Sequence, residues 1–558
     1  MRPRDYWGVG PKTEEKLLEE MTAERAVRAI EDADLRRLAE AGLPRGRAAR
    51  VVRRARSDGG LELLATPDAR EVYKALLGHV GRHAVNDDAA DRISVLTPRA
   101  DVDGAREHVD DVLSARDSLE HIGRTTVVDA LAGYEADRLT AVETALQLLE
   151  LDADDEFDVL AALDRVALEE ARDVLVELDR PTEDDEIKRI QTSLDEVERL
   201  ASEEDSVVET LQAGGAANET ELREAYVELV VEEADVDYSD VEAAAAEDAH
   251  DLLDFVSTSL RGLGDTLRGR LDRLHREHTE ELESRLTELE DEVDAAVDAV
   301  EETGLMVSLA EFARSIDGSP AEYSSDELEL RGARNLSLVA RDEDVQPVDY
   351  AVGADEPGGR VAVLTGANSG GKTTLLETVC ETTLLAYLGL PVAADSATVP
   401  ELDALVFHRR HSSFNAGVLE STLRNVVPPL TEKGRTLMLV DEFEAITEPG
   451  SAARLLHGLV KLTVDEDALG VFVTHLADDL EPLPEEARVD GIFAEGLDED
   501  LELVVDYQPR FGELGRSTPE FIVSRLLARS DHPGERAGFE VLAEAVGLER
   551  VQQTLDEI

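Results

Sequence analysis

Cysteine, lysine and tryptophan are scarce in this 558-residue chain, and long apolar runs are missing from it. The single cysteine, Cys380, excludes a disulfide within the chain and a metal site built from several of its own thiolates. No segment approaches the roughly 18 to 20 uncharged apolar residues that would span a bilayer, and the opening residues lack the apolar core of a signal peptide. We therefore expect a soluble, cytoplasmic protein with no membrane partner.

Positive charge is also scarce and is carried almost entirely by arginine. The chain has 56 Lys and Arg against 126 Asp and Glu, which gives a formal net charge of −70. Acidity spread over a whole chain keeps a protein hydrated in concentrated salt, whereas at low salt the self-repulsion destabilises the compact state. The composition predicts a halophilic, salt-accumulating host. A solvated surface accounts for this charge, so it does not exclude nucleic acid as a partner.

Residues 1–56 are a basic island, with 14 Lys and Arg against 10 Asp and Glu. Within "YWGVGPKTEEKLLEE", Gly8, Val9 and Gly10 are followed by Pro11 and a helical pattern. Glycines let backbone amides face outward, and amides at a helix N-terminus bind phosphate. The stretch therefore predicts a tight turn that opens a helix, with an ordinary helical turn as the alternative.

This turn resembles a helix-hairpin-helix DNA-binding motif, and a second helical unit at 34–56 would complete a pair of hairpins. The resemblance implies contacts to the sugar-phosphate backbone of double-stranded or branched DNA, made without reading its sequence. The residues assigned to these contacts are Gly8, Val9, Gly10, Lys12 and Lys16.

From about 60 to 320 the pattern is helical, and we expect a helical core at 60–180 and long lever or clamp helices at 181–320. Asn218 and Glu221 have the spacing of a capping box. Two stretches have heptad spacing, which predicts either long paired helices or a plain helical bundle. Their apolar positions are Leu260, Leu263, Leu267, Leu271 and Leu274, then Leu282, Leu286, Leu289, Val293, Val297 and Val300.

At residue 361 the period changes, and β-rich runs at 361–365, 405–407, 436–440 and 470–474 alternate with helical patterns. This alternation predicts an α/β domain with a largely parallel sheet. The segment "TGANSGGKTT" fits the phosphate-loop motif and lies between a strand and a helix, as the motif requires. The predicted nucleotide-binding residues are Gly366, Ala367, Asn368, Ser369, Gly370, Gly371, Lys372, Thr373 and Thr374.

The chemistry predicted for this loop is ATP hydrolysis with Mg²⁺. Lys372 would reach the β and γ phosphates, and the Thr373 hydroxyl would ligate the metal. A buried strand, "TLMLVDEFEAIT", ends in Asp441, predicted to hold the metal, and Glu442, predicted to polarise the attacking water. His475 ends a further strand, where an imidazole would contact the γ-phosphate.

Five segments in order resemble the ATPase domain of the MutS family: "TGANSGGKTT", "GLPVAADSATV", "HSSFNAGVLESTLRNVV", "DEFEAIT" and "THLADDL". The resemblance covers about 325–530 and leaves 531–558 as a helical tail. It implies a multidomain protein whose mainly α-helical N-terminal two-thirds is followed by an α/β, ABC-like P-loop ATPase domain. It also implies a homodimer through that domain, in which Ser412, Ser413 and Asn415 approach the partner's nucleotide.

Several departures from the family bear on function. Most MutS mismatch sensors begin with a domain that wedges an aromatic into the mismatch, and there is no room for it between the hairpins and the helical core. The loop at 444–446 carries Glu444 and Ile446 where small residues and glycine are usual. The tail has no sign of the small nuclease domain of one branch of the family, which leaves open whether a separate nuclease acts with this protein.

Three hypotheses follow. The first is a MutS-like ATPase that clamps mismatched, branched or distorted DNA, in mismatch repair or recombination control. The second is an ATP-binding architectural or switch module with little hydrolysis, which Glu444 beside the presumed base favours. The third, an SMC-type chromosome ATPase, is disfavoured because only 75 positions separate Gly366 from Asp441, with no coil between them.

Overall fold

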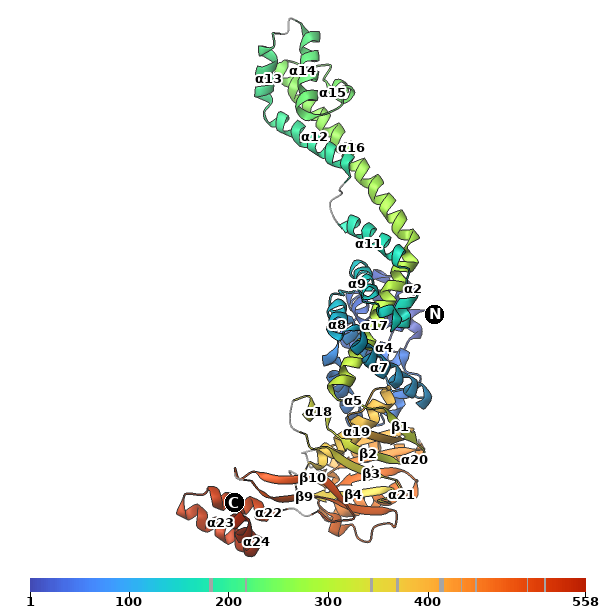
Figure 1. Cartoon of the computed structure of the whole chain (residues 1–558), viewed down its shortest axis with the longest axis vertical. Coiled ribbons are helices and arrows are strands. Elements are labelled where there is room, and N and C mark those ends of the chain that lie inside the picture. The colour runs from blue at the N-terminus through green and yellow to red at the C-terminus, as the bar shows by residue number, and fades with distance from the viewer. Residues whose placement is uncertain are drawn as a thin grey trace. The chain divides into compact units, whose positions relative to one another are not determined.

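The computed structural model describes residues 1–179, 184–215, 218–341, 345–367, 371–410, 416–432, 434–446, 449–498, 500–515 and 518–557. The chain forms two compact units (Figure 1). One joins Met1–Ala132 to Glu301–Ile558, and the other is Gly133–Val300. The domain boundaries expected from the sequence stay predictions. Among the described residues, no helix is both long enough and apolar enough to cross a membrane.

The N-terminal helices form a small layer with its own apolar core. Thr22 and Asp34 cap two of these helices by accepting hydrogen bonds from backbone amides of the first turn. Their buried residues include Leu17, Ile30 and Val51, which pack together. The bounds are α1 Pro11–Glu20, α2 Ala23–Glu31, α3 Leu35–Glu40 and α4 Arg45–Arg56, after a 3-10 turn at Pro3–Asp5.

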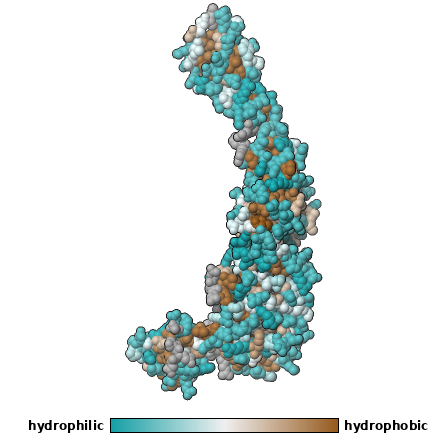
Figure 2. All heavy atoms as spheres, in the orientation of Figure 1, coloured by the Kyte–Doolittle hydropathy of each residue, from teal (hydrophilic) through white to brown (hydrophobic). Residues whose placement is uncertain are grey.

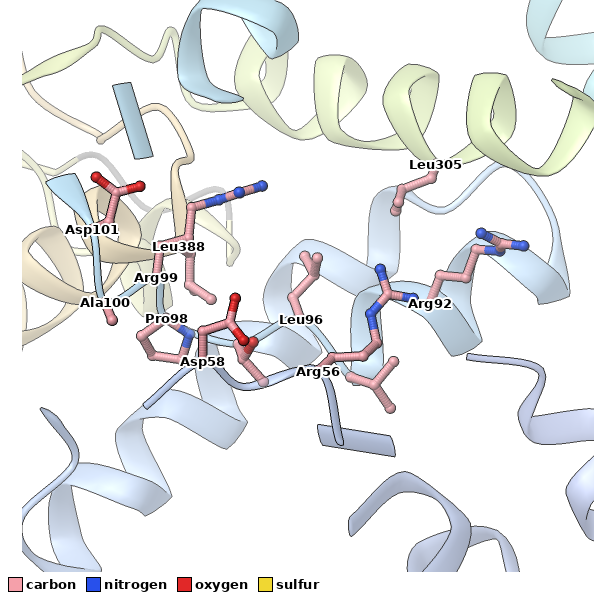
Figure 3. Close-up of a pocket in the computed structure, with 12 residues that line it drawn as sticks. Arg56, Asp58, Arg92, Leu96, Pro98, Arg99, Ala100, Asp101, Leu305 and Leu388 are labelled. Atoms are coloured by element: carbon pink, nitrogen blue, oxygen red, sulfur yellow. The ribbon is translucent and has the colours of Figure 1, made fainter. Parts of the chain in front are cut away.

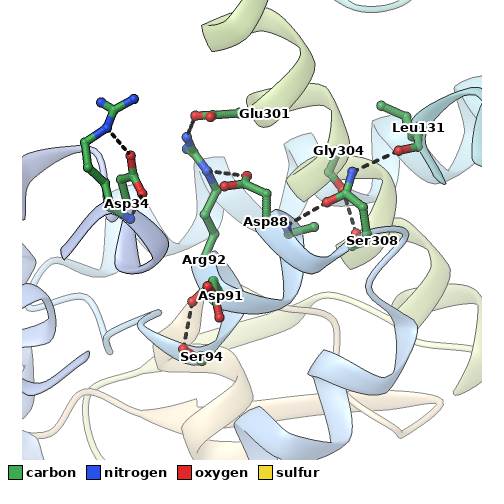
Figure 4. Close-up of polar contacts among 12 residues, drawn as sticks. Asp34, Asp88, Asp91, Arg92, Ser94, Leu131, Glu301, Gly304 and Ser308 are labelled. Carbon is green, nitrogen blue, oxygen red and sulfur yellow. Dashed lines mark hydrogen bonds and ion pairs between the residues drawn. The ribbon is translucent and has the colours of Figure 1, made fainter. Parts of the chain in front are cut away.

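A second helical layer connects these helices to the sheets. Its elements are α5 Pro67–Val80, α6 Asp87–Ser94, α7 Val102–Ile122, α8 Arg124–Ala132 and the C-terminal part of α17 Glu290–Ser315. Polar side chains join α6 to α17, as Figure 4 shows: Arg92 pairs with Asp88 and with Glu301. Asn86 caps α6 and donates to the carbonyl of Leu131, which ties α6 to α8 as well.

The part of the chain that carries the predicted phosphate loop is built on a sheet whose described strands follow the order β10-β9-β4-β8-β7-β6. Strands β4, β8, β7 and β6 are parallel, β9 is parallel to β4, and β10 is antiparallel to β9. The largely parallel α/β sheet predicted from the sequence is confirmed. The bounds are β4 Val361–Gly366, β6 Ala404–His408, β7 Thr436–Asp441, β8 Leu469–Val473, β9 Ala487–Leu497 and β10 Leu503–Phe511.

Helices cover both faces of this sheet, and β4 shows why its residues are uniformly apolar. Ala362 and Leu364 face one core together with α19 Lys372–Leu388, whereas Val361 and Val363 face another with α21 Pro449–Asp465. A strand buried on both faces needs a continuous apolar run. Two further helices belong to this region: the short α18 Leu336–Val339 and α20 Ala416–Glu432.

A smaller sheet, which the sequence pattern did not predict, lies in the same unit. Its described strands follow the order β1-β5-β2-β3 and include both parallel and antiparallel pairs. Apolar residues of these strands belong to the same core as α19. The bounds are β1 Ala321–Ser324, β2 Leu328–Ala333, β3 Val348–Val352 and β5 Ser396–Pro400.

The second unit is helical, and the first predicted heptad stripe lies inside it. Leu260, Leu263, Leu267 and Leu271 of α16 are buried in one core with residues of α12 to α15. This packing supports the bundle hypothesis for that stripe. Asn218 caps α14 by accepting from the backbone amide of Glu221, while its side-chain amide, not its backbone amide, donates to the Glu221 carboxylate, so only half of the predicted capping box forms. The bounds are α9 Arg138–Glu150, α10 Asp158–Ala161, α11 Arg165–Asp179, α12 Asp185–Ser202, α13 Glu204–Ala213, α14 Glu219–Ala234, α15 Tyr238–Ala244 and α16 Leu252–Glu288.

Three helices end the chain: α22 Pro519–Arg529, α23 Pro533–Val546 and α24 Leu548–Glu557. They share a small core that includes Val523, Leu527 and Val551. Their outer surfaces also carry exposed large apolar side chains, namely Ile522, Leu526, Val541, Leu542 and Leu548. Elsewhere hydrophilic residues dominate the visible surface, as Figure 2 shows and as the net charge of −70 leads one to expect.

Candidate nucleotide site

The phosphate loop follows β4 and ends at α19, and its two flanking glycines are required by their surroundings. A Cβ atom on Gly366 would lie 2.2 Å from the carbonyl oxygen of Ile492, and its φ is +134°. Gly371 has φ +74°, and a Cβ there would lie 2.8 Å from Cδ1 of Tyr507. The chain therefore passes close to β9 at the first glycine and close to β10 at the second. The predicted residues Asn368, Ser369 and Gly370 lie outside the described residues.

Lys372 is the first residue of α19 and is only 4% exposed. Its ammonium donates to the carbonyls of Gly366 and Ala367, at 3.0 and 2.6 Å. Burial lowers the pKa of Lys372, and the nearby carboxylates of Glu442 and Asp441 oppose that shift. The cation is thus held inside the loop, against the acidic end of β7, where it can meet the phosphates of a nucleotide.

The next residue, Thr373, joins the loop to β7. Its hydroxyl donates to Oδ2 of Asp441 at 2.9 Å. The other carboxylate oxygen, Oδ1, is buried and has no hydrogen-bond partner among the described residues. Burial raises the pKa of Asp441, while the bond from Thr373 opposes that shift.

The Thr373 hydroxyl and the Asp441 carboxylate, whose Oδ1 has no hydrogen-bond partner among the described residues, are ligand types that suit Mg²⁺. This metal is usually bound by one or two carboxylates together with waters and substrate phosphates, rather than by a cage of side chains. Thr373 and Asp441 are therefore the side chains that would hold the metal beside a bound nucleotide.

Glu442 is fixed by two neighbours. Its backbone has φ +42°, a left-handed conformation that non-glycine residues adopt rarely and often at functional sites. Its Oε1 lies 2.8 Å from Nε2 of His475, and its Oε2 lies 2.7 Å from a guanidinium nitrogen of Arg410. The hydrogen bond with His475 holds the pKa of Glu442 below its usual value. The carboxylate therefore stays ionised, as a base or a water-orienting group requires.

Glu444 holds the backbone of His475 in place. Its Oε1 accepts from the backbone amide of His475 at 2.7 Å and from the Thr474 hydroxyl at 2.8 Å. Its Oε2 is buried without a hydrogen-bond partner among the described residues. The unusual loop residue noted in the sequence thus supports the corner that carries His475.

The structure brings together Lys372, Thr373, Asp441, Glu442 and His475, which the sequence placed in one site. Thr374, in the first turn of α19, lies next to them. Arg410 and Tyr507 also lie at the site, although they were not predicted from the sequence. Arg410 could have been predicted, because it is a basic residue directly before the predicted in-trans segment. Tyr507 could not, because no local sequence pattern marks it and only the pairing of β9 with β10 brings it to Gly371. Ser412, Ser413 and Asn415 lie outside the described residues.

The predicted DNA contacts lie on the N-terminal helices. Gly8 has φ +86°, Val9 is buried, and Gly10 is the N-cap of α1. Lys12 and Lys16 are exposed and one helical turn apart, so they lie on the same face of α1. The assignment of these residues to DNA contacts stays a prediction.

A cavity of about 230 Å³ lies at the opposite end of α19 from the phosphate loop (Figure 3). Its lining includes Arg56 from α4, Arg92 from α6 and Leu388, the last residue of α19. Arg92 is engaged by Asp88 and Glu301. The cavity lies where α4 meets α6 and the C-terminal end of α19, and it is separate from the candidate nucleotide site.

A glycine-rich loop between a strand and a helix, with an acidic strand end beside it, is typical of an α/β domain of the P-loop nucleotide-binding class. No family model matches the chain. A DNA-binding protein MutS2 of Pyrococcus furiosus is 42% identical over 258 residues, 45% of this chain and 44% of that protein. An endonuclease MutS2 of Shouchella clausii is 27% identical over 285 residues, 50% of this chain and 35% of that protein.

The mitochondrial DNA mismatch repair protein MSH1 of Arabidopsis thaliana is 34% identical over 122 residues, 20% of this chain and 11% of that protein. These matches and the order of the five motifs show that a large part of the chain is similar to proteins of the MutS family. The chain matches less than half the length of these curated relatives.

Proposed function

We propose that this protein is a Mg²⁺-dependent ATPase that couples ATP binding and hydrolysis to holding mismatched, branched or otherwise distorted DNA. The observation that carries the proposal is the meeting of Lys372, Thr373–Asp441 and Glu442–His475 at one edge of the sheet. MutS-family relatives whose names include DNA binding and mismatch repair support the DNA part.

Each residue has a chemical task in this proposal. Lys372 neutralises charge on the β and γ phosphates, and Thr373 with Asp441 holds the metal, which supplies further charge neutralisation when bound. Glu442 orients the attacking water, and His475 keeps that carboxylate in place and ionised. Binding energy for ATP drives a conformational change only if the two states of the protein bind ATP with different affinities.

The active form that we propose is a homodimer through the ATPase domain. Ser412, Ser413 and Asn415 of one chain would complete the nucleotide site of the other. The exposed apolar residues on α22, and on α23 and α24 in the tail that follows the ATPase domain, would add to this contact, because burying apolar surface favours association. A separate nuclease is a further partner that this function would accommodate.

A second function is favoured by one specific observation. Both carboxylate oxygens of Glu442 are already engaged, one by His475 and one by Arg410. A carboxylate held in this way polarises water poorly until Arg410 moves away. The same site would then act as an ATP-binding switch with little hydrolysis.

The experiment that separates these functions is ATP turnover in multimolar KCl, alone and with homoduplex, mismatched or four-way-junction DNA. High salt avoids confusing unfolding with a lack of binding, although it also weakens backbone contacts. Turnover that rises with distorted DNA and not with homoduplex supports the proposal. ATP binding with no response of the rate to any DNA rejects it in favour of the switch.

A further inference from the structure

Trp7 is the one tryptophan of the chain, and it is 63% exposed. Tryptophan has a large apolar surface whose burial normally stabilises a fold, so its exposure needs an explanation. It immediately precedes Gly8, in the turn that opens α1. An exposed aromatic at this place is available to a ligand.

The backbone that carries Trp7 is anchored on both sides. The Tyr6 hydroxyl donates to Glu31, and burial together with this bond raises the pKa of Tyr6 to about 12. On the other side, Arg47 of α4 donates to the carbonyl of Gly8 at 3.1 Å, and Val9 is buried in the apolar core. The indole is therefore presented from a fixed turn instead of a loose terminus.

A basic stripe on α4 lies beside this turn. Arg47, Arg50 and Arg54 are exposed and spaced by three and four residues, so they share one face of the helix. In the part of the chain that the structure describes, none of the three pairs with a carboxylate, although the protein has 126 acidic residues, and Arg47 and Arg50 donate to the backbone carbonyls of Gly8 and Gly46. Unpaired arginines in so acidic a protein complement an anionic partner.

We propose that Trp7 stacks on an unpaired or unstacked base of distorted DNA, whose backbone phosphates lie along Arg47, Arg50 and Arg54. This inference rests on the proposed DNA-binding function and goes beyond it, because it assigns the preference for distorted DNA to one side chain. Stacking tolerates every base, since each has a π-face, but it needs a base that has left the duplex stack. Bulges, mismatches and junctions supply such bases, and an intact duplex does not.

The single tryptophan makes the test direct, because fluorescence excited selectively in the indole reports on this position alone. The full chain is titrated with homoduplex, with a duplex carrying a one-nucleotide bulge and with a four-way junction. Binding is followed in parallel by the anisotropy of labelled DNA. We expect quenching of Trp7 by the bulged and branched DNA, and little change with bound homoduplex.

Variants then distinguish the contribution of base stacking to DNA affinity from that of charge. Trp7→Ala should weaken binding of bulged DNA about 5- to 150-fold, the range that corresponds to removing one stacked base, and should leave homoduplex binding nearly unchanged. Trp7→Phe should restore most of the affinity. Leu18→Ala, which truncates an exposed apolar residue of α1 that is 45% exposed, is the matched control and should bind all three DNAs as the wild type does.

Salt dependence gives a second, independent readout. Arg50→Ser should weaken binding to every DNA and reduce the slope of log affinity against log salt by about one, because one phosphate contact is lost. Trp7→Ala should leave that slope unchanged. If Trp7→Ala binds all three DNAs as tightly as the wild type and bound DNA leaves the fluorescence unaltered, the inference is wrong while DNA binding stands. If the wild type binds none of the DNAs, the proposed function itself fails.

Discussion

Lys372 supplies a buried positive charge at the candidate nucleotide site. It lies buried against Gly366 and Ala367, and the acidic end of β7 is its nearest counter-charge. Replacing it by alanine removes the cation that would meet the transferred phosphate. We expect Lys372→Ala to lower ATP turnover on the order of 10²- to 10³-fold, the usual effect of removing one transition-state charge contact.

The control for this variant is Lys461→Ala. Lys461 lies on α21 and pairs with Asp465 one turn away on an exposed surface, where such pairs contribute little. Turnover is measured by phosphate release at fixed KCl. Equal loss of turnover in both variants, or none in Lys372→Ala, would contradict the assignment of the phosphate loop.

Glu381 is a buried carboxyl whose proton makes stability depend on pH. It lies in α19 and accepts hydrogen bonds from Asn335 and from the amide of Leu336. Burial raises its pKa from 4.5 to about 7. The folded chain therefore keeps a proton that the unfolded chain releases, and the free energy of unfolding falls as pH rises from about 4.5 to about 7.

The variant Glu381→Gln removes this titration and keeps the shape. We expect it to stabilise the fold above pH 7 by up to about 3 kcal/mol, with the gain shrinking toward pH 5. Thermal unfolding at several pH values and constant KCl measures the effect. Glu420→Gln, which changes an exposed glutamate paired with Arg424, should show no such pH dependence. A pH-independent difference for Glu381→Gln would rule out the buried proton.

At the scale of elements, the site depends on how closely β4 approaches β9. Gly366 leaves no space for a Cβ, because the Ile492 carbonyl lies 2.2 Å from that position, and its φ of +134° excludes most side chains. We expect Gly366→Ala to destabilise the protein by roughly 2–4 kcal/mol and to abolish nucleotide binding.

Gly458 is the control for Gly366, because it has space for a Cβ. It lies within α21, and a Cβ there meets nothing within 4 Å. Gly458→Ala should therefore stabilise the protein by up to about 1 kcal/mol, because alanine favours a helix interior. Denaturant unfolding of both variants gives the two free energies. The explanation fails if the two substitutions change stability in the same direction.

At the scale of the whole molecule, net charge controls stability. A formal charge of −70 repels itself over about 10 Å at 0.1 M salt but over only about 3 Å at 1 M. We expect the unfolding midpoint to rise steeply with KCl and then to level off near molar concentrations. Sucrose, which stabilises without screening charge, should not reproduce the steep part. A midpoint independent of KCl would contradict the halophilic prediction.

Association is the second property at this scale. If α22–α24 cover a partner chain, a charge on their exposed apolar surface should oppose the dimer. We expect Val541→Asp to shift the protein from dimer to monomer in sedimentation velocity with a non-hydrolysable ATP analogue. Val541 is 65% exposed, and Val166 in the other unit, 75% exposed, provides the control Val166→Asp, which should remain dimeric. A wild type that is monomeric at every concentration would reject the dimer.

The sequence by itself determined the class of the C-terminal domain. Four of its β-rich runs are the strands β4, β6, β7 and β8, and the phosphate loop lies between β4 and α19 as its motif requires. These features are local, since buried parallel strands need continuous apolar runs and a phosphate loop needs glycines at fixed spacing.

Only the tertiary structure decided which distant residues share the site. The approach of Tyr507 to Gly371 and the bonds that fix Glu442 join segments far apart in the chain, and no short-range pattern encodes them. The same holds for the β1-β5-β2-β3 sheet, whose short strands lack a clear period in the sequence. A motif fixes what a side chain can do, whereas packing fixes which neighbours it meets, because that depends on the whole chain at once.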